Sequence, residues 1–292
     1  MTWQFERVAG PYRGPASGVA WDGEAVLFSL PSEDRILRYS PANGDVTEFR
    51  RYTSRTSGLA LSATGNLYGA QTGSRRIVSF NGDGSASVLA YRLDGRFHNF
   101  PNDLAVDPQG RIWFTDPYGR QPAAGPALQG PLEHASVLRL QRDHRREWRL
   151  SRMTFDTKAP TAICVSADGK TVYVSENEEA LDGKRELRAY PVGDDGSLGP
   201  HAVLLTFGSD QRGPHRGVEG MCLDSRGNIV ACAGWQRSGP GPLVYVVSPT
   251  GQILETHPAP ADLPMSCAFG NADLSTLYLT AGDGSLFRSR EA

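Results

Sequence analysis

The fold of this chain is decided by a repeated pattern whose clearest copy reads Asn102-Asp-Leu-Ala-Val-Asp-Pro-Gln-Gly-Arg-Ile-Trp-Phe-Thr-Asp116. A polar residue opens a short apolar stretch, a polar turn containing Gly110 follows, and a second apolar stretch ends the unit. Two apolar stretches joined by a glycine-containing turn are typical of a β-hairpin. The same opening recurs at Ser17-Gly-Val-Ala, Ser57-Gly-Leu-Ala, Thr161-Ala-Ile-Cys, Glu219-Gly-Met-Cys and, more loosely, Ser266-Cys-Ala-Phe.

A hairpin that recurs six times at intervals of roughly 40 to 60 residues predicts an all-β, six-bladed β-propeller. The last repeat offers three strand-like stretches, and too few residues follow Arg290 for a fourth strand. We therefore expect the N-terminal stretch 3–9 to supply the outer strand of the sixth blade and to close the ring. We expect a single domain over residues 1–292, because an all-β chain of this length folds as one unit.

Composition excludes several classes of function. The net charge is −2 and no long run of either sign occurs, so electrostatically driven binding to nucleic acid is not expected. No apolar segment is long enough to span a membrane and no signal peptide is recognisable, so we expect a cytoplasmic protein. No C-x-x-C pair occurs, and we expect buried structural thiols at the four cysteines, Cys164, Cys222, Cys232 and Cys267.

The first residue of each repeat is expected at one end of the central channel, where the innermost strands converge. These residues are Ser17, Ser57, Asn102, Thr161, Glu219 and Ser266. Small polar side chains at such positions either solvate the channel or contact a substrate. Glu219 differs, because a carboxylate among apolar strands must be paired, bound to a metal or shifted in pKa. Glu219 is therefore the leading candidate for a catalytic group.

The ends of the second strands form another ring of candidates. Gln71 and Asp116 are candidate substrate contacts at this level, although Asp116, which precedes Pro117, is better suited to capping a turn. Glu176 begins the acidic run Glu-Asn-Glu-Glu, which we expect to be a solvated loop.

Two histidines and an arginine lie in the segments that precede repeat openings. His98 and His215 are each expected near the channel mouth, where a histidine can act as a base, a metal ligand or a hydrogen-bond donor. Arg216 would either hold a substrate carboxylate or phosphate or pair with Glu219. Three longer inserts, residues 119–135, 178–185 and 209–216, would either cover a binding site or form plain surface.

Several phrases closely resemble the gluconolactonase/regucalcin-like family, above all Phe100-Pro-Asn-Asp-Leu-Ala-Val-Asp and Gly110-Arg-Ile-Trp-Phe-Thr-Asp-Pro-Tyr-Gly. Weaker matches, such as Trp21-Asp-Gly-Glu-Ala-Val-Leu-Phe-Ser and Leu274-Ser-Thr-Leu-Tyr-Leu-Thr-Ala-Gly, extend the resemblance over nearly the whole chain. The resemblance implies a six-bladed propeller with one divalent cation at the channel mouth. It also implies hydrolysis of sugar lactones and related cyclic esters.

The chain departs from the family pattern at the positions that hold the cation. Ser17 stands where a glutamate is common and Thr161 where an asparagine is usual, while Asn102 is unchanged. Glu219 replaces an aspartate that the resemblance implies to be both ligand and base. Glu219, Asn102 and Thr161 remain as candidate ligands for Ca²⁺, Zn²⁺, Mn²⁺ or Fe²⁺. One carboxylate, one amide and one hydroxyl make a poor set for calcium, which takes six to eight oxygens.

Three hypotheses follow. The first is a hydrolase of a lactone or related small cyclic ester, in which Glu219 is the general base, Asn102 orients substrate or water and a cation polarises the carbonyl group. The second drops the metal: Glu219 works with His98, His215 or Arg216 in an elimination, isomerisation, cyclisation or hydrolysis. The third is a non-catalytic propeller that binds a small molecule or a protein. The sequence carries no signal for the oligomeric state.

Overall fold

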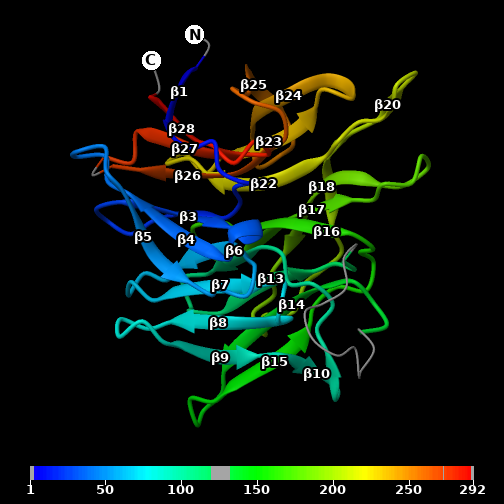
Figure 1. The fold of residues 1–292 in the computed structure, drawn as a ribbon. Helices are drawn as coiled ribbons and strands as arrows, with labels where there is room; N and C mark the ends of the chain where they lie inside the picture. The colour runs from blue at the N-terminus through cyan, green and yellow to red at the C-terminus, as the bar shows by residue number, and fades with distance from the viewer. Residues whose placement is uncertain (1–2, 120–131, 272, 291–292) are drawn as a thin grey trace.

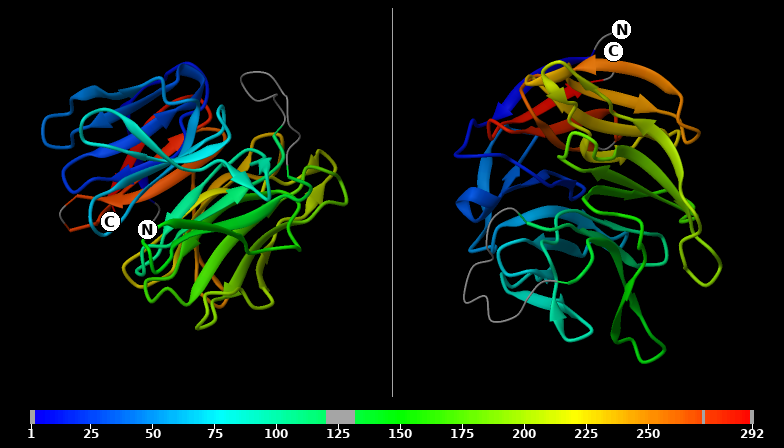
Figure 2. Two further views of the ribbon diagram at one scale, coloured as in Figure 1. Left: turned by 90° about the horizontal axis from the view of Figure 1, so that it is seen from below. Right: turned by 90° about the vertical axis from the view of Figure 1, so that its right-hand side faces the viewer.

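The computed structural model describes residues 3–119, 132–271 and 273–290, and it confirms the six-bladed β-propeller. Six four-stranded antiparallel sheets follow one another around a ring in chain order (Figure 1). The views from two further directions show the same succession of blades (Figure 2). Within the described ranges the sole helical segment is a 3₁₀ turn, η1 (Pro31–Glu33), and no helix there is long and apolar enough to cross a lipid bilayer.

In the first three blades the innermost strand comes first in the chain. Blade one consists of β2 (Val19–Trp21), β3 (Val26–Leu30), β4 (Arg35–Tyr39) and β5 (Val46–Arg51). Blade two consists of β6 (Thr56–Leu61), β7 (Leu67–Gln71), β8 (Arg76–Phe80) and β9 (Ala86–Ala90). Blade three consists of β12 (Leu104–Val106), β13 (Ile112–Asp116), β14 (Ser136–Arg142) and β15 (Trp148–Arg152).

Blades four and five repeat this order, and blade six takes its outer strand from the start of the chain. Blade four consists of β16 (Pro160–Val165), β17 (Thr171–Asn177), β18 (Arg185–Pro191) and β19 (Ala202–Thr206). Blade five consists of β22 (Val218–Leu223), β23 (Ile229–Trp235), β24 (Ser238–Val247) and β25 (Ile253–Pro258). Blade six consists of β26 (Pro264–Gly270), β27 (Thr276–Ala281), β28 (Leu286–Arg290) and β1 (Gln4–Ala9).

The expected closure of the ring by the N-terminal strand is confirmed. β1 pairs antiparallel with β28, with Phe5 opposite Ser289. An ion pair at 3.0 Å between Glu6 and Arg288 adds to this pairing. β1 and β28 accordingly lie side by side near the top of Figure 1.

Among the described residues the core consists of six apolar clusters, one between each pair of adjacent blades. Leu27 and Ile36 of blade one, for example, pack against Leu59 and Val78 of blade two. Each blade therefore buries apolar side chains on both faces, and the hydrophobic contribution to stability is spread around the ring.

Buried hydroxyl groups join consecutive blades near the channel. In four blades a serine or threonine at or near the end of the second strand donates a hydrogen bond to a backbone carbonyl of a neighbouring blade. These bonds are Ser29 to Ser57 (2.6 Å), Thr115 to Thr161 (2.9 Å), Ser175 to Val218 (2.6 Å) and Thr280 to Ser17 (2.8 Å). They hold the starts of the innermost strands in place.

Glycines next to the repeat openings let the innermost strands approach closely. The N–H of Gly58 donates to the carbonyl of Asn102 at 2.8 Å, which joins blades two and three. A Cβ atom at Gly58 would lie 2.7 Å from Cα of Asp103, closer than real contacts allow. The channel is therefore narrow at this level.

Two of the three inserts are described. Residues 209–216 contain a short hairpin of β20 (Ser209–Asp210) and β21 (Gly213–Pro214), and residues 178–184 form the loop before β18. A further hairpin, β10 (Arg92–Leu93) and β11 (Arg96–Phe97), precedes His98. Most of the insert 119–135 falls on residues 120–131, outside the described ranges.

All four cysteines are free, as predicted. Cys164, Cys232 and Cys267 are buried, whereas Cys222 is partly exposed. The Sγ atoms of Cys222 and Cys267 are 3.5 Å apart, a contact between two thiols.

Candidate functional site

The openings of three repeats meet in one cleft at the channel mouth. Asn102, Thr161 and Glu219 all line a cleft of about 660 Å³. The rest of the lining comes mainly from the segments before and after these strands: Arg55, Thr72, Phe100, Pro117, Tyr118, Gly119, Lys158, Ala159, Asn177, Glu179, Arg216 and Met265. These three residues and Arg216 therefore line the same cleft, and their functional roles stay predictions.

The carboxylate of Glu219 is held at one oxygen. Oε1 accepts hydrogen bonds from Nδ2 of Asn177 at 2.8 Å and from Nε of Arg216. No hydrogen bond from the described part of the chain reaches Oε2. Arg216 also pairs with Glu179 at 3.1 Å, and its guanidinium carbon lies 5.5 Å from the ring centre of Trp235. The expected pairing of Arg216 with Glu219 is confirmed, and it places a fixed positive charge beside the carboxylate.

A chain of hydrogen bonds forms the floor of the cleft. The hydroxyls of Ser17 and Ser57 are 3.1 Å apart, and Ser57 donates to Oδ1 of Asn102 at 3.2 Å. Nδ2 of Asn102 in turn donates to the carbonyl of Thr161 at 3.0 Å. Ser17, Ser57, Asn102 and Glu219 also line a space of only about 10 Å³ in the channel below, which holds one water molecule at most.

The channel wall next to Asn102 carries a second carboxyl group. Asp103 accepts hydrogen bonds from the N–H groups of Leu104 (3.0 Å) and Ile163 (3.1 Å). Burial nevertheless raises the pKa of Asp103 to about 7, because desolvation outweighs these two bonds. Asp103 joins blades three and four and does not line the cleft.

Three candidate residues lie behind the wall of the cleft instead of in it. Gln71 is buried and accepts hydrogen bonds from Ser74 and Arg76. Asp116 is fully buried and accepts a hydrogen bond at 2.8 Å from the N–H of Asn99, which agrees with its expected capping role. Burial raises the pKa of Asp116 to about 7.

His98 is the third of these residues. Its ring is fully buried, 5.3 Å from the ring of Phe114, and neither ring nitrogen has a hydrogen-bond partner in the described part of the chain. Burial, together with the positive charge of Arg75, lowers the pKa of His98 to about 3. His98 is therefore neutral at physiological pH and does not line the cleft.

His215 lies next door, in a smaller pocket of about 190 Å³ that adjoins the cleft. Its Nε2 is 3.7 Å from a carboxylate oxygen of Asp210. His215 thus approaches the site without lining the cleft itself.

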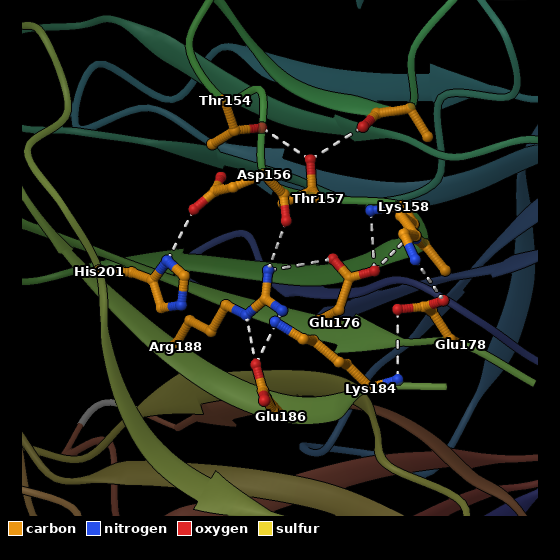
Figure 3. Close-up of polar contacts among 12 residues, drawn as sticks. Thr154, Asp156, Thr157, Lys158, Glu176, Glu178, Lys184, Glu186, Arg188 and His201 are labelled. Carbon is orange, nitrogen blue, oxygen red and sulfur yellow. Dashed lines mark hydrogen bonds and ion pairs between the residues drawn. The ribbon is translucent and has the colours of Figure 1, made fainter. Parts of the chain in front are cut away.

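The expectation of a solvated loop at Glu176 is wrong. Glu176 is 1% exposed, accepts a hydrogen bond from the N–H of Lys158 at 2.9 Å and another from that of Ala159, and faces Arg188 at 3.5 Å. Burial raises its pKa despite these partners. Figure 3 shows Glu176 between Arg188 and the Lys158 backbone. Because Lys158 and Ala159 line the cleft, Glu176 positions part of its rim.

The residue that sequence analysis missed is the next one, Asn177. Neighbouring side chains of a strand point to opposite faces, so the burial of Glu176 behind the rim turns Asn177 toward Glu219. The alternation of side chains between the two faces of a strand was therefore the signal that could have identified Asn177. No local signal marked Trp235 or the loop residue Glu179, which reach the site from different blades.

The donor set does not fit a divalent cation. Within residues 3–119, 132–271 and 273–290, no three His, Cys, Asp or Glu side chains are grouped so that they could hold a metal ion. Glu219 is already paired with Arg216, whose charge opposes a second cation, and Oδ1 of Asn102 already accepts a hydrogen bond from Ser57 at 3.2 Å. A divalent cation bound by Glu219, Asn102 and Thr161 stays a prediction, and these contacts argue against it.

The comparisons with known proteins agree with the architecture. The family model described as SMP-30/Gluconolactonase/LRE-like region matches residues 15–283. A gluconolactonase from Zymomonas mobilis is 25% identical over 301 residues, covering 94% of this chain and 80% of that protein. A regucalcin from Oryctolagus cuniculus is 39% identical over 280 residues, covering 92% of this chain and 84% of that protein.

The fold is shared with a solved enzyme along almost its whole length. The structure of a gluconolactonase from Xanthomonas campestris has a TM-score of 0.81 and is 29% identical, covering 99% of this chain and 89% of that one. The family match over residues 15–283 includes the openings of all six repeats, among them those that form the cleft. The chain therefore belongs to the SMP-30/gluconolactonase/LRE-like family.

Proposed function

We propose that this chain hydrolyses a lactone or a related small cyclic ester in the cleft that Glu219 lines. Family membership supports this reaction, because the relatives that match most of the chain include gluconolactonases. One observation carries the proposal: the carboxylate of Glu219 is anchored where the cleft meets the channel. The cleft volume of about 660 Å³ suits a small-molecule substrate.

The two carboxylate oxygens of Glu219 have different tasks in this proposal. Oε1 is anchored by Asn177 and Arg216, which fixes the orientation of the group. Oε2 takes a proton from a water molecule while the water oxygen bonds to the carbonyl carbon of the lactone. The bond between that carbon and the ring oxygen then breaks, the ring oxygen takes the proton that Glu219 accepted from water, and the product is an open-chain hydroxy acid.

Arg216 supplies the positive charge that this reaction needs. Negative charge develops on the carbonyl oxygen during attack, and a preorganised positive group in a cleft stabilises it. Arg216 is fixed by Glu219, Glu179 and the ring of Trp235. Asn102 and Thr161 line the same cleft, where they would position the substrate. His98 and His215 have no role in the proposed mechanism, because neither lines the cleft.

No step of this mechanism runs through a metal ion, because the groups around Glu219 do not fit one. This proposal therefore takes the reaction of the first hypothesis and the metal-free chemistry of the second. The single domain over residues 1–292 and the cytoplasmic location stay predictions.

The test is Glu219→Gln, assayed on five- and six-membered sugar lactones by acid release at pH 7.5, with and without chelator. We expect kcat/KM to fall at least ~100-fold, the contribution of a general base, and we expect the wild-type rate to survive chelation. The matched control is Glu24→Gln, because Glu24 is 87% exposed in the turn between β2 and β3.

The possible outcomes separate the parts of the proposal. Full activity of Glu219→Gln would refute the role of Glu219 as base. Loss of wild-type activity with chelator, restored by added cation, would refute the metal-free mechanism while keeping the hydrolase. Hydrolysis of no lactone by the folded wild type would refute the reaction.

A further inference from the structure

A second pocket of about 190 Å³ opens beside the cleft and shares Asn177, Glu179 and Arg216 with it. Its other lining residues are Glu178, Arg185, Pro214, His215, Trp235 and Arg237. Three of the nine lining residues are arginines, and they come from the ends of different strands and loops of blades four and five. The pocket therefore gathers positive charge next to Glu219.

Arg185 is a buried cation that pairs with no carboxylate of the described residues. It is 5% exposed, and its Nη1 donates to the carbonyls of Glu178 (3.1 Å) and Ala180 (2.8 Å). Nε is buried and has no hydrogen-bond partner in the described part of the chain. Carbonyl oxygens satisfy some of the N–H groups but do not neutralise the charge, and an uncompensated buried charge is unfavourable. This guanidinium would be stabilised by an anion in the pocket.

Trp235 and Arg237 complete the other wall. Nε1 of Trp235 donates to the hydroxyl of Ser238 at 2.7 Å, which fixes the orientation of the indole. The guanidinium of Arg237 lies 5.3 Å from the indole ring centre, and Arg216 lies against the same ring at 5.5 Å. No carboxylate of the described residues pairs with Arg237. Two guanidinium groups are thus held by one aromatic ring at the pocket.

The two acidic lining residues are already engaged by other cations. Glu178 accepts the N–H of Lys184 at 3.2 Å and faces Nζ of Lys158 at 3.4 Å. Glu179 pairs with Arg216 at 3.1 Å. These pairings leave the charges of Arg185 and Arg237 to attract a ligand.

We propose that this pocket binds a compact oxyanion group, namely a phosphate, sulfonate or carboxylate, carried by the substrate. Guanidinium groups bind such anions through charge-assisted hydrogen bonds. Because the pocket and the cleft share Arg216, an anionic substituent in the pocket would place the rest of a ligand beside Glu219. The substrate class is then an anionic lactone. The substrate assignment rests on the proposed function, whereas anion binding by the pocket does not.

The experiment measures anion binding and turnover separately. Inorganic phosphate and sulfate are titrated into the folded protein by calorimetry at constant ionic strength, with chloride as the balancing salt. Arg237→Gln is the main variant, because Arg237 is exposed and makes no hydrogen bond to any described residue. Its replacement should therefore leave the loop folded. Arg92→Gln is the matched control, since Arg92 is likewise exposed and lies 4.6 Å from the ring centre of Phe97, away from the pocket.

We expect phosphate or sulfate to bind the wild type and Arg92→Gln equally, and Arg237→Gln at least ~10-fold more weakly, because one charge-assisted contact is lost. Arg237→Gln should also raise KM for an anionic lactone and leave that for a neutral lactone unchanged. Arg185→Gln should abolish anion binding; if this variant does not fold, Arg237→Gln decides alone.

The failures of the two proposals are distinguishable. Anion binding that is absent from the wild type, or that weakens equally in Arg92→Gln and Arg237→Gln, overturns the anion pocket even if neutral lactones are hydrolysed. Anion binding that depends on Arg237 in a protein that hydrolyses no lactone supports the pocket and refutes the proposed function.

Discussion

The buried pair of Arg188 and Glu176 allows a quantitative prediction. Both side chains are 1% exposed (Figure 3). Arg188 donates from Nε to Glu186 at 2.8 Å and from Nη1 to the carbonyl of Asp156 at 3.1 Å, and it faces Glu176 at 3.5 Å. Replacing Arg188 by Met keeps most of the volume but leaves Glu176 without a counter-ion. Breaking a buried pair in this way costs about 3–5 kcal/mol.

We expect Arg188→Met to lower the free energy of unfolding by about 3–5 kcal/mol at pH 7.5. Denaturation in urea is followed by the fluorescence of the five tryptophans. The double variant Glu176→Gln/Arg188→Met should recover at least ~2 kcal/mol, because position 176 then carries no buried charge. Glu186, which is 14% exposed, loses Arg188 in both variants. Arg149→Met is the control: Arg149 is 62% exposed and pairs with two carboxylates, so its loss should cost no more than about 1 kcal/mol.

The pH dependence of this variant gives a second readout. Burial already raises the pKa of Glu176, and removal of Arg188 raises it further. A carboxyl group whose pKa is raised in the folded state binds its proton more tightly there than in the unfolded chain. Such a group therefore destabilises the folded state increasingly as the pH rises above its pKa in the unfolded chain, and less in acid. The loss of unfolding free energy caused by Arg188→Met should therefore be smaller at pH 5 than at pH 7.5. A deficit below about 1 kcal/mol at pH 7.5, or one independent of pH, would refute the argument.

Two further predictions concern buried groups near the channel. Thr115→Val removes two hydrogen bonds, one to the carbonyl of Thr161 (2.9 Å) and one from the N–H of Asp103 (3.1 Å). We expect the free energy of unfolding, measured by thermal denaturation, to fall by about 1–3 kcal/mol. An unchanged melting temperature would contradict the role of the hydroxyl in joining blades. The pKa of His98 is lowered to about 3, so the folded state excludes a proton that the unfolded chain binds below pH 6.5. Between pH 6.5 and pH 4.5 the free energy of unfolding of the wild type should accordingly fall by about 2–3 kcal/mol more than that of His98→Leu. Urea denaturation at several pH values measures this difference. Equal pH profiles would show that His98 takes up its proton in the folded state.

Local sequence patterns were sufficient to predict the blades. Each hairpin lies within one repeat, so alternating apolar stretches and Gly110-type turns specify it without distant contacts. The closing strand followed from the same count, because the last repeat lacked one strand. Glu219 and Arg216 are three residues apart, which made their pairing foreseeable.

Contacts between blades could not be predicted in the same way. Whether Glu176 or Asn177 faces the cleft depends on register, and a shift of one residue exchanges the two faces of a strand. The small pocket combines Arg185, Trp235 and Arg237, which are brought together by the packing of blades four and five. His98 lies only four residues before the repeat opening at Asn102 in the sequence. After the hairpin of β10 and β11, however, its ring is buried in the core beside Phe114.

The pairing of β1 with β28 has a consequence for synthesis of the chain. Glu6 and Arg288 are 282 residues apart, and a ribosome that adds 5–20 residues per second needs roughly 15 to 60 seconds between them. During this interval β1 has no partner strand, and an unpaired strand edge can pair with another chain. Earlier blades have all their strands in sequence order and can form as they emerge. The waiting time of β1 is thus set by translation and not by the stability of the finished ring.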